Sequence, residues 1–177
     1  VIANQKAIAS DDAYLARCRP QPGVDPLWYV PHNHHFLWFA ATMEGASAVA
    51  LEAAKATSAR TSDPKLMRAA GFEAMQVFSL TPLFANVRFG RWQDVEGWPQ
   101  PEDDLPYMIA MWHYAQGVAA ARQGKADEAR RHHEKVVEAA RNPDIEKMKV
   151  WDRYSIIHGV RIAERMLAAE LARAQKD

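Results

Sequence analysis

Two glycines, Gly90 and Gly124, lie 34 residues apart, and each closes one helix-like stretch and opens another. They occur in VRFGRWQDV (87–95) and ARQGKADEA (121–129), and the same arrangement recurs at Gly45 in MEGASAVA (43–50). A glycine turn that recurs at a period of this length is typical of stacked helix pairs. The spacing therefore predicts an α-solenoid, which is a stack of antiparallel helix pairs. It says little about which ligand the protein binds or which reaction it catalyses.

The rest of the chain also has the pattern of helices. Apolar side chains recur at helical spacing, and no segment shows the sustained alternation of a strand or the Asn-Gly turn of a hairpin. The predicted helices cover 3–17, 31–43, 47–59, 63–80, 82–88, 92–97, 105–122, 127–141 and 146–175. We therefore predict an all-α fold without strands that forms one domain over residues 1–177.

Prolines mark where helices must break, because proline lacks the amide donor and restricts the residue before it. Four of them fall in CRPQPGVDPLWYVP (18–31), which predicts a loop or extended crossover anchored by Trp28 and Tyr29. Thr81-Pro82 predicts either a kink or a fresh helix start that is capped by Thr81.

The charges are balanced, with 22 Lys and Arg against 22 Asp and Glu. The chain therefore has no overall field to attract nucleic acid or an anionic membrane surface, and no apolar run approaches the roughly 18 residues of a membrane span. We expect neither as a partner. The single cysteine, Cys18, fits a reducing compartment and favours the cytoplasm. Because the sequence begins at Val1, in what reads as the middle of a helix, we expect a piece of a longer protein.

The segment VAAARQGKADEARRHHEKVVEAARNP (118–143) resembles a tetratricopeptide repeat. In this resemblance Gly117 is the small residue midway along the first helix, Gly124 is the turn, and Ala129 is the small residue where the second helix crosses the first. Pro143 follows shortly after the second helix ends. A larger side chain at either crossing position would force the two helices apart.

Two further copies of the repeat are more divergent. The first copy keeps the crossing residue as Ala50, but Trp38 replaces the small mid-helix residue. In the second copy Leu83 and Val95 replace both small residues. PHNHHFLWFAATMEG and RFGRW are also similar to a group of bacterial repeat proteins. The resemblance implies a tetratricopeptide-like solenoid of about three divergent repeats plus terminal helices.

The resemblance also implies a scaffold, whose first helices line a concave groove that binds an extended peptide or a partner's tail. The groove positions of the family correspond to His32, His35, Phe39, Thr42 and Met43, to Val77, Leu80, Phe84, Val87 and Arg88, and to Met111, Tyr114, Val118, Ala121 and Arg122. Arg88 and Arg122 are equivalent cations one repeat apart. They could hold a carboxylate together, or each could pair with a neighbouring acid. The exposed terminal helices could also join two copies of the chain.

The histidines leave an alternative function open. His32, His34 and His35 cluster in PHNHH, and neutral imidazole is a common ligand of zinc, copper and iron. His32 and His35 lie three residues apart and so face the same side of a helix. With His113 they would form the ligand set of a metal- or small-molecule-binding protein.

Sequence signatures of catalysis and of bound cofactors are missing. The chain contains no HExxH, no CxxC, no glycine-rich phosphate loop and no G-x-S-x-G. Its paired acids lie at predicted helix starts, where the positive end of the helix dipole explains them. We therefore expect no catalytic residues and no cofactor, and a binding protein more than an enzyme.

Overall fold

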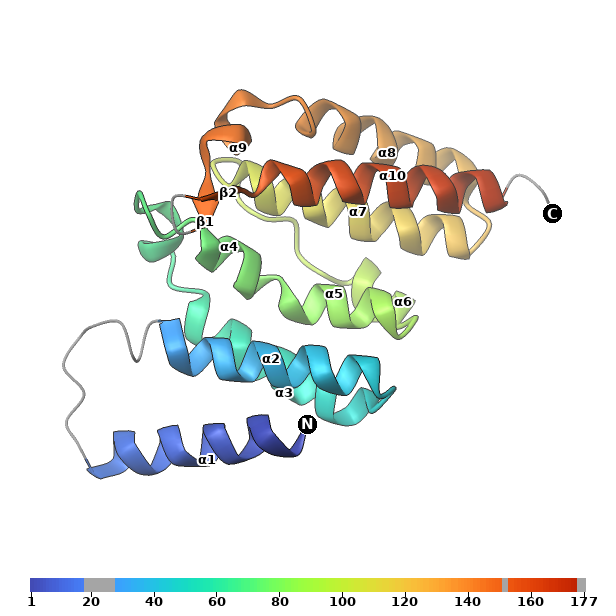
Figure 1. Ribbon diagram of the computed structural model, residues 1–177. Coiled ribbons are helices and arrows are strands. Elements are labelled where there is room, and N and C mark those ends of the chain that lie inside the picture. Colours follow the sequence, from blue (N-terminus) through green and yellow to red (C-terminus); the bar gives the residue numbers. More distant parts are fainter. Residues whose placement is uncertain (18–27, 151–152, 175–177) are drawn as a thin grey trace.

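The computed structural model describes residues 1–17, 28–150 and 153–174, and within them it is all-α except for one short hairpin (Figure 1). The predicted all-α class is confirmed, whereas the expectation of a fold without strands is wrong. The helices are α1 (Ile2–Arg17), α2 (Val30–Met43), α3 (Ser47–Thr61), the 3₁₀ helix η2 (Leu66–Arg68), α4 (Ala74–Ser79), α5 (Thr81–Arg88), α6 (Trp92–Glu96), α7 (Pro106–Arg122), α8 (Ala126–Ala139), α9 (Pro143–Lys147) and α10 (Ile157–Ala174). In this part of the chain, no helix is both long and apolar enough to cross a membrane.

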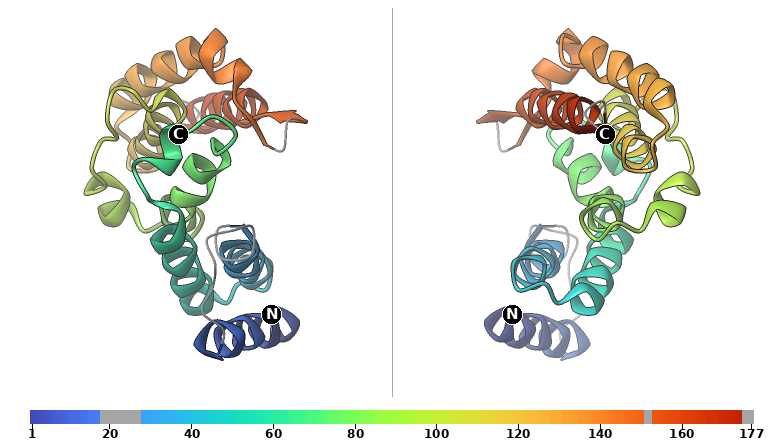
Figure 2. Two further views of the ribbon diagram at one scale, coloured as in Figure 1. Left: turned by 90° about the vertical axis from the view of Figure 1, so that its left-hand side faces the viewer. Right: turned by 90° about the vertical axis from the view of Figure 1, so that its right-hand side faces the viewer.

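The helices pack against one another largely in chain order. α1 packs on α2, α2 packs along α3, and α3 contacts α4 and α5. Farther along the chain, α7 packs along α8, and α10 lies against both of them. Seen from the side, the helices form an arc, with α3 and α6 on its outer side and α2 and α10 on its inner side (Figure 2).

The three turn glycines end their helices in the same way. Gly45, Gly90 and Gly124 have φ angles of 74°, 67° and 76°, a left-handed conformation that other residues disfavour. In each turn the amide that follows the glycine donates to the carbonyl five residues earlier at 2.9 Å, in the pairs Ala46–Ala41, Arg91–Asn86 and Lys125–Ala120. The glycine amide donates to the carbonyl three residues earlier. These paired hydrogen bonds form a Schellman motif, so the predicted turns are confirmed.

The residues at the predicted helix crossings are buried. Ala50, Val95 and Ala129 each lie five positions after a turn glycine, and none of them is exposed to solvent. A Cβ atom on Gly117 would lie 2.6 Å from Leu167 Cδ2 and 3.1 Å from the Cβ of His132. The need for a small residue at 117 is therefore set by two neighbours of α7, helix α8 and helix α10.

The helix predicted over 63–80 is wrong over most of its length. Asp63 caps the start of this segment, because its Oδ1 accepts hydrogen bonds from the backbone amides of Lys65 and Leu66 at 2.8 and 3.0 Å. The chain then forms only η2, turns at Gly71 with φ 83°, and becomes helical again in α4. Met67 and Met75, on either side of this bend, are buried in one cluster with Leu105.

The predicted break at Thr81 is confirmed, because α5 begins there directly after α4 ends. Thr81 does not cap α5, however. Leu80 holds the N-cap position, and the Thr81 hydroxyl donates instead to the carbonyl of Phe78 at 2.6 Å. Pro82 lies in the first turn of α5, where its missing amide costs no helical hydrogen bond.

The last predicted helix, 146–175, is wrong before residue 157. Strands β1 (Lys149–Val150) and β2 (Tyr154–Ser155) form an antiparallel hairpin there, with Lys149 opposite Ser155 and Val150 opposite Tyr154. Ile145 before the hairpin and Ile156 after it are both buried in the main core. The hairpin folds the chain back so that both isoleucines reach this core. Strands of only two residues are too short to show an alternating pattern in the sequence.

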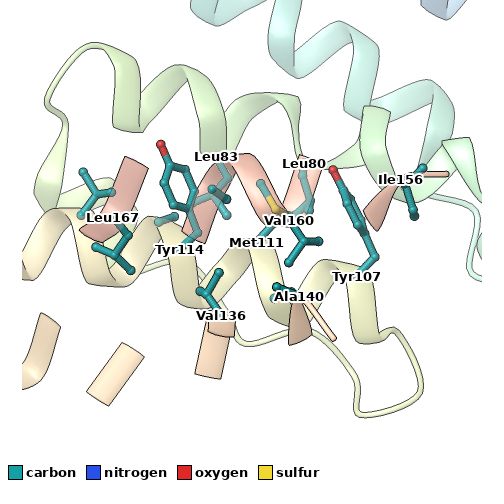
Figure 3. Packing of buried hydrophobic residues seen from close by; sticks show 14 of the residues in the cluster. Leu80, Leu83, Tyr107, Met111, Tyr114, Val136, Ala140, Ile156, Val160 and Leu167 are labelled. Carbon is teal, nitrogen blue, oxygen red and sulfur yellow. The ribbon is translucent and has the colours of Figure 1, made fainter. Parts of the chain in front are cut away.

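The main core surrounds α7 and extends to α5, α8 and α10 (Figure 3). Its buried members include Leu80, Leu83, Tyr107, Met111, Tyr114, Val136, Ala140, Ile156, Val160 and Leu167. Eleven of the 17 residues of α7 are buried, whereas no residue of α1 is. The core therefore lies toward the C-terminal end of the arc.

The predicted crossover at 18–31 lies mostly outside the described residues, and Cys18 with it. Trp28 is described, and its ring stacks on that of Phe72 with centroids 5.7 Å apart. Its predicted role as an anchor is thus confirmed. Tyr29 is no anchor, because 58% of its surface is exposed to solvent.

Candidate ligand-binding groove

A groove of about 330 Å³ opens between α5, α7 and α10. It is lined by Phe84, Val87, Arg88, Trp92, Tyr114, Val118, Arg122, Met166 and Glu170. Six of these residues, on α5 and α7, are groove positions that the tetratricopeptide resemblance indicated. Helices α5 and α7 contact each other, so these equivalent positions meet in one groove.

The two groove arginines have different environments. Arg122 donates from Nη2 to Glu170 Oε1 at 2.7 Å, and its Nε lies 2.7 Å from Glu170 Oε2 in an ion pair without an aligned hydrogen bond. The second of the alternatives considered from sequence, pairing with a neighbouring acid, therefore describes Arg122. Arg88 is exposed and has no acidic partner among residues 1–17, 28–150 and 153–174. It is thus the arginine that remains available to a ligand.

Tyr114 forms a wall of the groove near the ion pair. Its side chain is buried, and its hydroxyl lies 3.9 Å from the sulfur of Met166 on α10. Burial, with a smaller contribution from the negative charge of Glu170, raises the pKa of the Tyr114 phenol. The hydroxyl therefore remains protonated at neutral pH and can donate a hydrogen bond to a ligand.

The predicted groove residues of α2 do not line this groove. Phe39 and Met43 are exposed, by 57% and 69%. His35 packs between Trp38 and Phe78, with ring centroids 4.9 and 5.0 Å away. Helix α2 packs mainly against α3 and α1 and touches α5 only slightly, so its side chains do not reach the groove on α5, α7 and α10.

The other two predicted residues of α2 have local surroundings. The ring of His32 lies 4.3 Å from that of Phe36 on the same helix. The hydroxyl of Thr42 is buried and has no hydrogen-bond partner within the described part of the chain. Neither side chain contributes to the groove on α5, α7 and α10.

Several predicted groove residues of the second and third copies are core residues instead. Leu80, Met111 and Ala121 are buried, by more than nine-tenths of their surface, and Val77 packs against the same core. Figure 3 shows Leu80 and Met111 side by side within the cluster. Helix α10 covers the face of α7 that the prediction left open, and it thereby converts Met111 from a groove residue into a core residue.

The histidine alternative does not assemble in the fold. His113 lies on α7 and pairs with His132 on α8, with their Nδ1 atoms 2.8 Å apart, and not with His32 and His35 on α2. Across residues 1–17, 28–150 and 153–174, no three His, Cys, Asp or Glu side chains are placed to hold a metal ion. The predicted ligand set of His32, His35 and His113 is therefore not brought together.

These histidines are instead neutral packing residues. Burial, together with His132 and Lys135 nearby, lowers the pKa of His113 to about 4. Burial, together with His32, lowers the pKa of His35 to about 4. At neutral pH both imidazoles are uncharged, and one nitrogen of the His113–His132 pair carries the proton that the other accepts.

The sequence did not reveal three groove residues, Trp92, Met166 and Glu170. Met166 is apolar, yet 53% of its surface is exposed at the edge of the groove. Met166 and Glu170 lie four residues apart and so share one face of α10. The missing information was the position of α10 against α7, which no local pattern encodes.

Comparison with protein-family models, with curated proteins and with solved structures finds no match to this chain. The interpretation of the chain as a repeat protein therefore depends on its own residues. The strongest of these are the three turns at Gly45, Gly90 and Gly124, which share one hydrogen-bonding pattern. Their spacing and chemistry are the basis of the proposal that follows.

Proposed function

We propose that the protein is a divergent tetratricopeptide-like solenoid that binds a segment of a partner protein in the groove between α5, α7 and α10. The observation that carries the proposal is that Phe84, Arg88, Tyr114 and Arg122, which resemblance alone selected, line one groove. In this proposal α2–α3, α5–α6 and α7–α8 are the three repeats. α1 and α10 are the terminal helices.

The composition of the groove supports a peptide-like ligand. Phe84, Val87 and Trp92 provide apolar walls, while Arg88 and the Tyr114 hydroxyl provide polar groups beside them. Burying one Leu- or Phe-sized side chain in such a groove stabilises a complex by about 1.5 to 3 kcal/mol. One anchoring side chain with a polar contact beside it gives weak binding, so a partner segment would use neighbouring surface as well.

Helix α10 offers a matched pair of substitutions to test this proposal. Met166 lines the groove and Ile162 does not, although they lie one turn apart and are 53% and 61% exposed. Because both are exposed, Met166→Glu and Ile162→Glu should each leave the fold intact. We expect Met166→Glu to abolish partner binding, because it places bulk and charge in the groove, and Ile162→Glu to retain most of it.

The measurement begins with affinity purification from the native host and identification of the retained protein by mass spectrometry. The interacting segment is then made as a synthetic peptide, and its affinity for the wild type and both variants is measured by calorimetry. Hydrogen exchange should show that the bound peptide protects α5, α7 and α10. Equal affinity in the Met166→Glu variant, or protection confined to α2, would contradict the proposal.

A further inference from the structure

We infer that the groove selects a partner segment with one acidic side chain next to an apolar one, and that Glu170 determines this selectivity by occupying the anion position at Arg122. This inference rests on the proposed function, because it specifies the ligand of the same groove. It concerns the roles of Arg88, Arg122 and Glu170, which together decide how many carboxylates the groove accepts.

Arg88 and Arg122 occupy equivalent positions in the chain. Each lies two residues before a turn glycine that ends its helix, and both line the groove. On sequence grounds the two cations would accept two carboxylates or share one. The surroundings of the two side chains make them unequal, because α10 supplies an acid to one of them only.

Glu170 holds Arg122 in the manner of a bound carboxylate. Its Oε1 accepts a hydrogen bond from Nη2 at 2.7 Å and its Oε2 lies 2.7 Å from Nε as an ion pair, so it occupies the place beside the guanidinium that a ligand carboxylate would take. Arg173 lies 3.3 Å from the same carboxylate and helps to hold it in place. A second carboxylate that approached Arg122 would meet the negative charge of Glu170, so the groove disfavours it.

Arg88 provides the anion position that remains open. It is exposed, it lines the groove, and within the described ranges of the chain no acidic side chain pairs with it. The Trp92 ring lies next to the turn that ends α5, with its Cζ2 3.5 Å from where a Cβ on Gly90 would be. Phe84, Val87 and Trp92 form an apolar wall next to the cation. A ligand carboxylate at Arg88 therefore brings its neighbouring side chain onto this wall.

The probe for this inference is a phage-displayed library of random linear peptides, selected separately on the immobilised wild type, Arg88→Gln and Glu170→Gln. Gln has the shape of Glu, so Glu170→Gln removes only the charge, whereas Arg88→Gln shortens the side chain and removes the guanidinium together with its charge. Arg130→Gln on α8 is the control, since Arg130 is exposed, pairs with Asp127 and lies outside the groove. Circular dichroism confirms that each variant is folded before selection.

We expect the wild type and Arg130→Gln to enrich peptides with one acidic residue beside an aromatic or branched apolar one. Arg88→Gln should lose the acidic residue from its consensus and bind the wild-type peptide roughly tenfold or more weakly. Glu170→Gln should enrich peptides with two acidic residues, because Arg122 is then free to bind the second.

Two other outcomes separate this inference from the proposed function. An identical consensus for the wild type and Glu170→Gln, or a wild-type consensus without an acidic residue, overturns the inference and leaves peptide binding intact. The absence of any enriched peptide contradicts peptide binding itself. If Glu170→Gln does not fold, fluorescence polarisation on the wild type decides, since a synthetic peptide with two acids should bind no better than its one-acid counterpart.

Discussion

The two ends of the arc differ in how completely their helices are packed. Around α7, α8 and α10 the side chains form a continuous core, and Leu167 and Val136 are fully buried within it. At the N-terminal end, α1 buries no residue, and a cleft of about 610 Å³ is lined by α1, α2 and α3. Ile8, Leu37 and Val49 line this cleft.

The difference shows that regular turns alone do not give a helix pair a core. The α2–α3 pair has the same glycine turn as α7–α8. What α7 has in addition is a third helix, α10, packed against both members of its pair. Buried area and packing density therefore depend on how many helices surround a pair, and the groove lies at the well-packed end.

The largest expected effect on stability comes from truncating one apolar side chain at each end of the arc. Leu167→Ala should lower the free energy of unfolding by about 3 to 4 kcal/mol, because it leaves a cavity in a closed core. Ile8→Ala should cost less than about 1 kcal/mol, because its side chain borders an open cleft. Urea unfolding measures both values. An equal cost for the two would show that the cleft is closed in solution.

A smaller effect is expected from adding a methyl group to a helix. Gly117→Ala should destabilise the protein by about 2 kcal/mol, since its Cβ would lie 2.6 Å from Leu167 and 3.1 Å from His132. Gly159→Ala on α10 is the matched control, because its Cβ would only reach ordinary contact with Tyr107 at 3.8 Å. It should stabilise the helix by about 0.5 to 1 kcal/mol. Thermal and urea unfolding of both variants check the opposite signs.

Acid should produce the smallest effect, and it tests both ends at once. His35 and His113 have folded pKa values of about 4, below the 6.5 of an unperturbed imidazole, because burial disfavours the charged form. The unfolded chain therefore binds more protons between these values, and stability falls as the pH drops from 6.5 to 4. We expect about 1 kcal/mol per histidine after allowing for solvent screening.

The variants His35→Phe and His113→Phe should each remove part of this acid sensitivity, as measured by urea unfolding at pH 7 and pH 5. Hydrogen exchange at pH 5 should show α1 and α2 opening before α7, because the N-terminal end has less buried apolar surface to hold it. Opening of α7 and α8 first would reverse the order of stability inferred from the packing.

Much of the local structure followed from short stretches of sequence. Gly45, Gly90 and Gly124 were recognised as turns, and the small side chains at the crossings proved to be buried. The prediction failed where a distant contact overrode the local pattern. The segment at 63–80 bends where Met67 and Met75 are buried in one cluster. The chain forms a hairpin between Ile145 and Ile156, which are both buried in the main core.

Six of the nine residues that line the groove were also predictable. They include Phe84, Arg88, Tyr114 and Arg122, which were selected because the resemblance places equivalent positions on one surface. The α2 positions and Met111 were not correct, since α2 packs mainly against α3 and α1 and α10 covers Met111. Repeat equivalence does not predict which positions a neighbouring helix will cover.

The sequence by itself determined most of the helices and the three glycine turns, because these depend on backbone conformation and on side chains a few positions apart. Only the tertiary structure decided that Glu170, 48 residues after Arg122, pairs with that arginine and leaves Arg88 available. The physical reason is that an ion pair between two helices depends on how their surfaces pack. That packing is set by the whole core around α7 and not by any one segment.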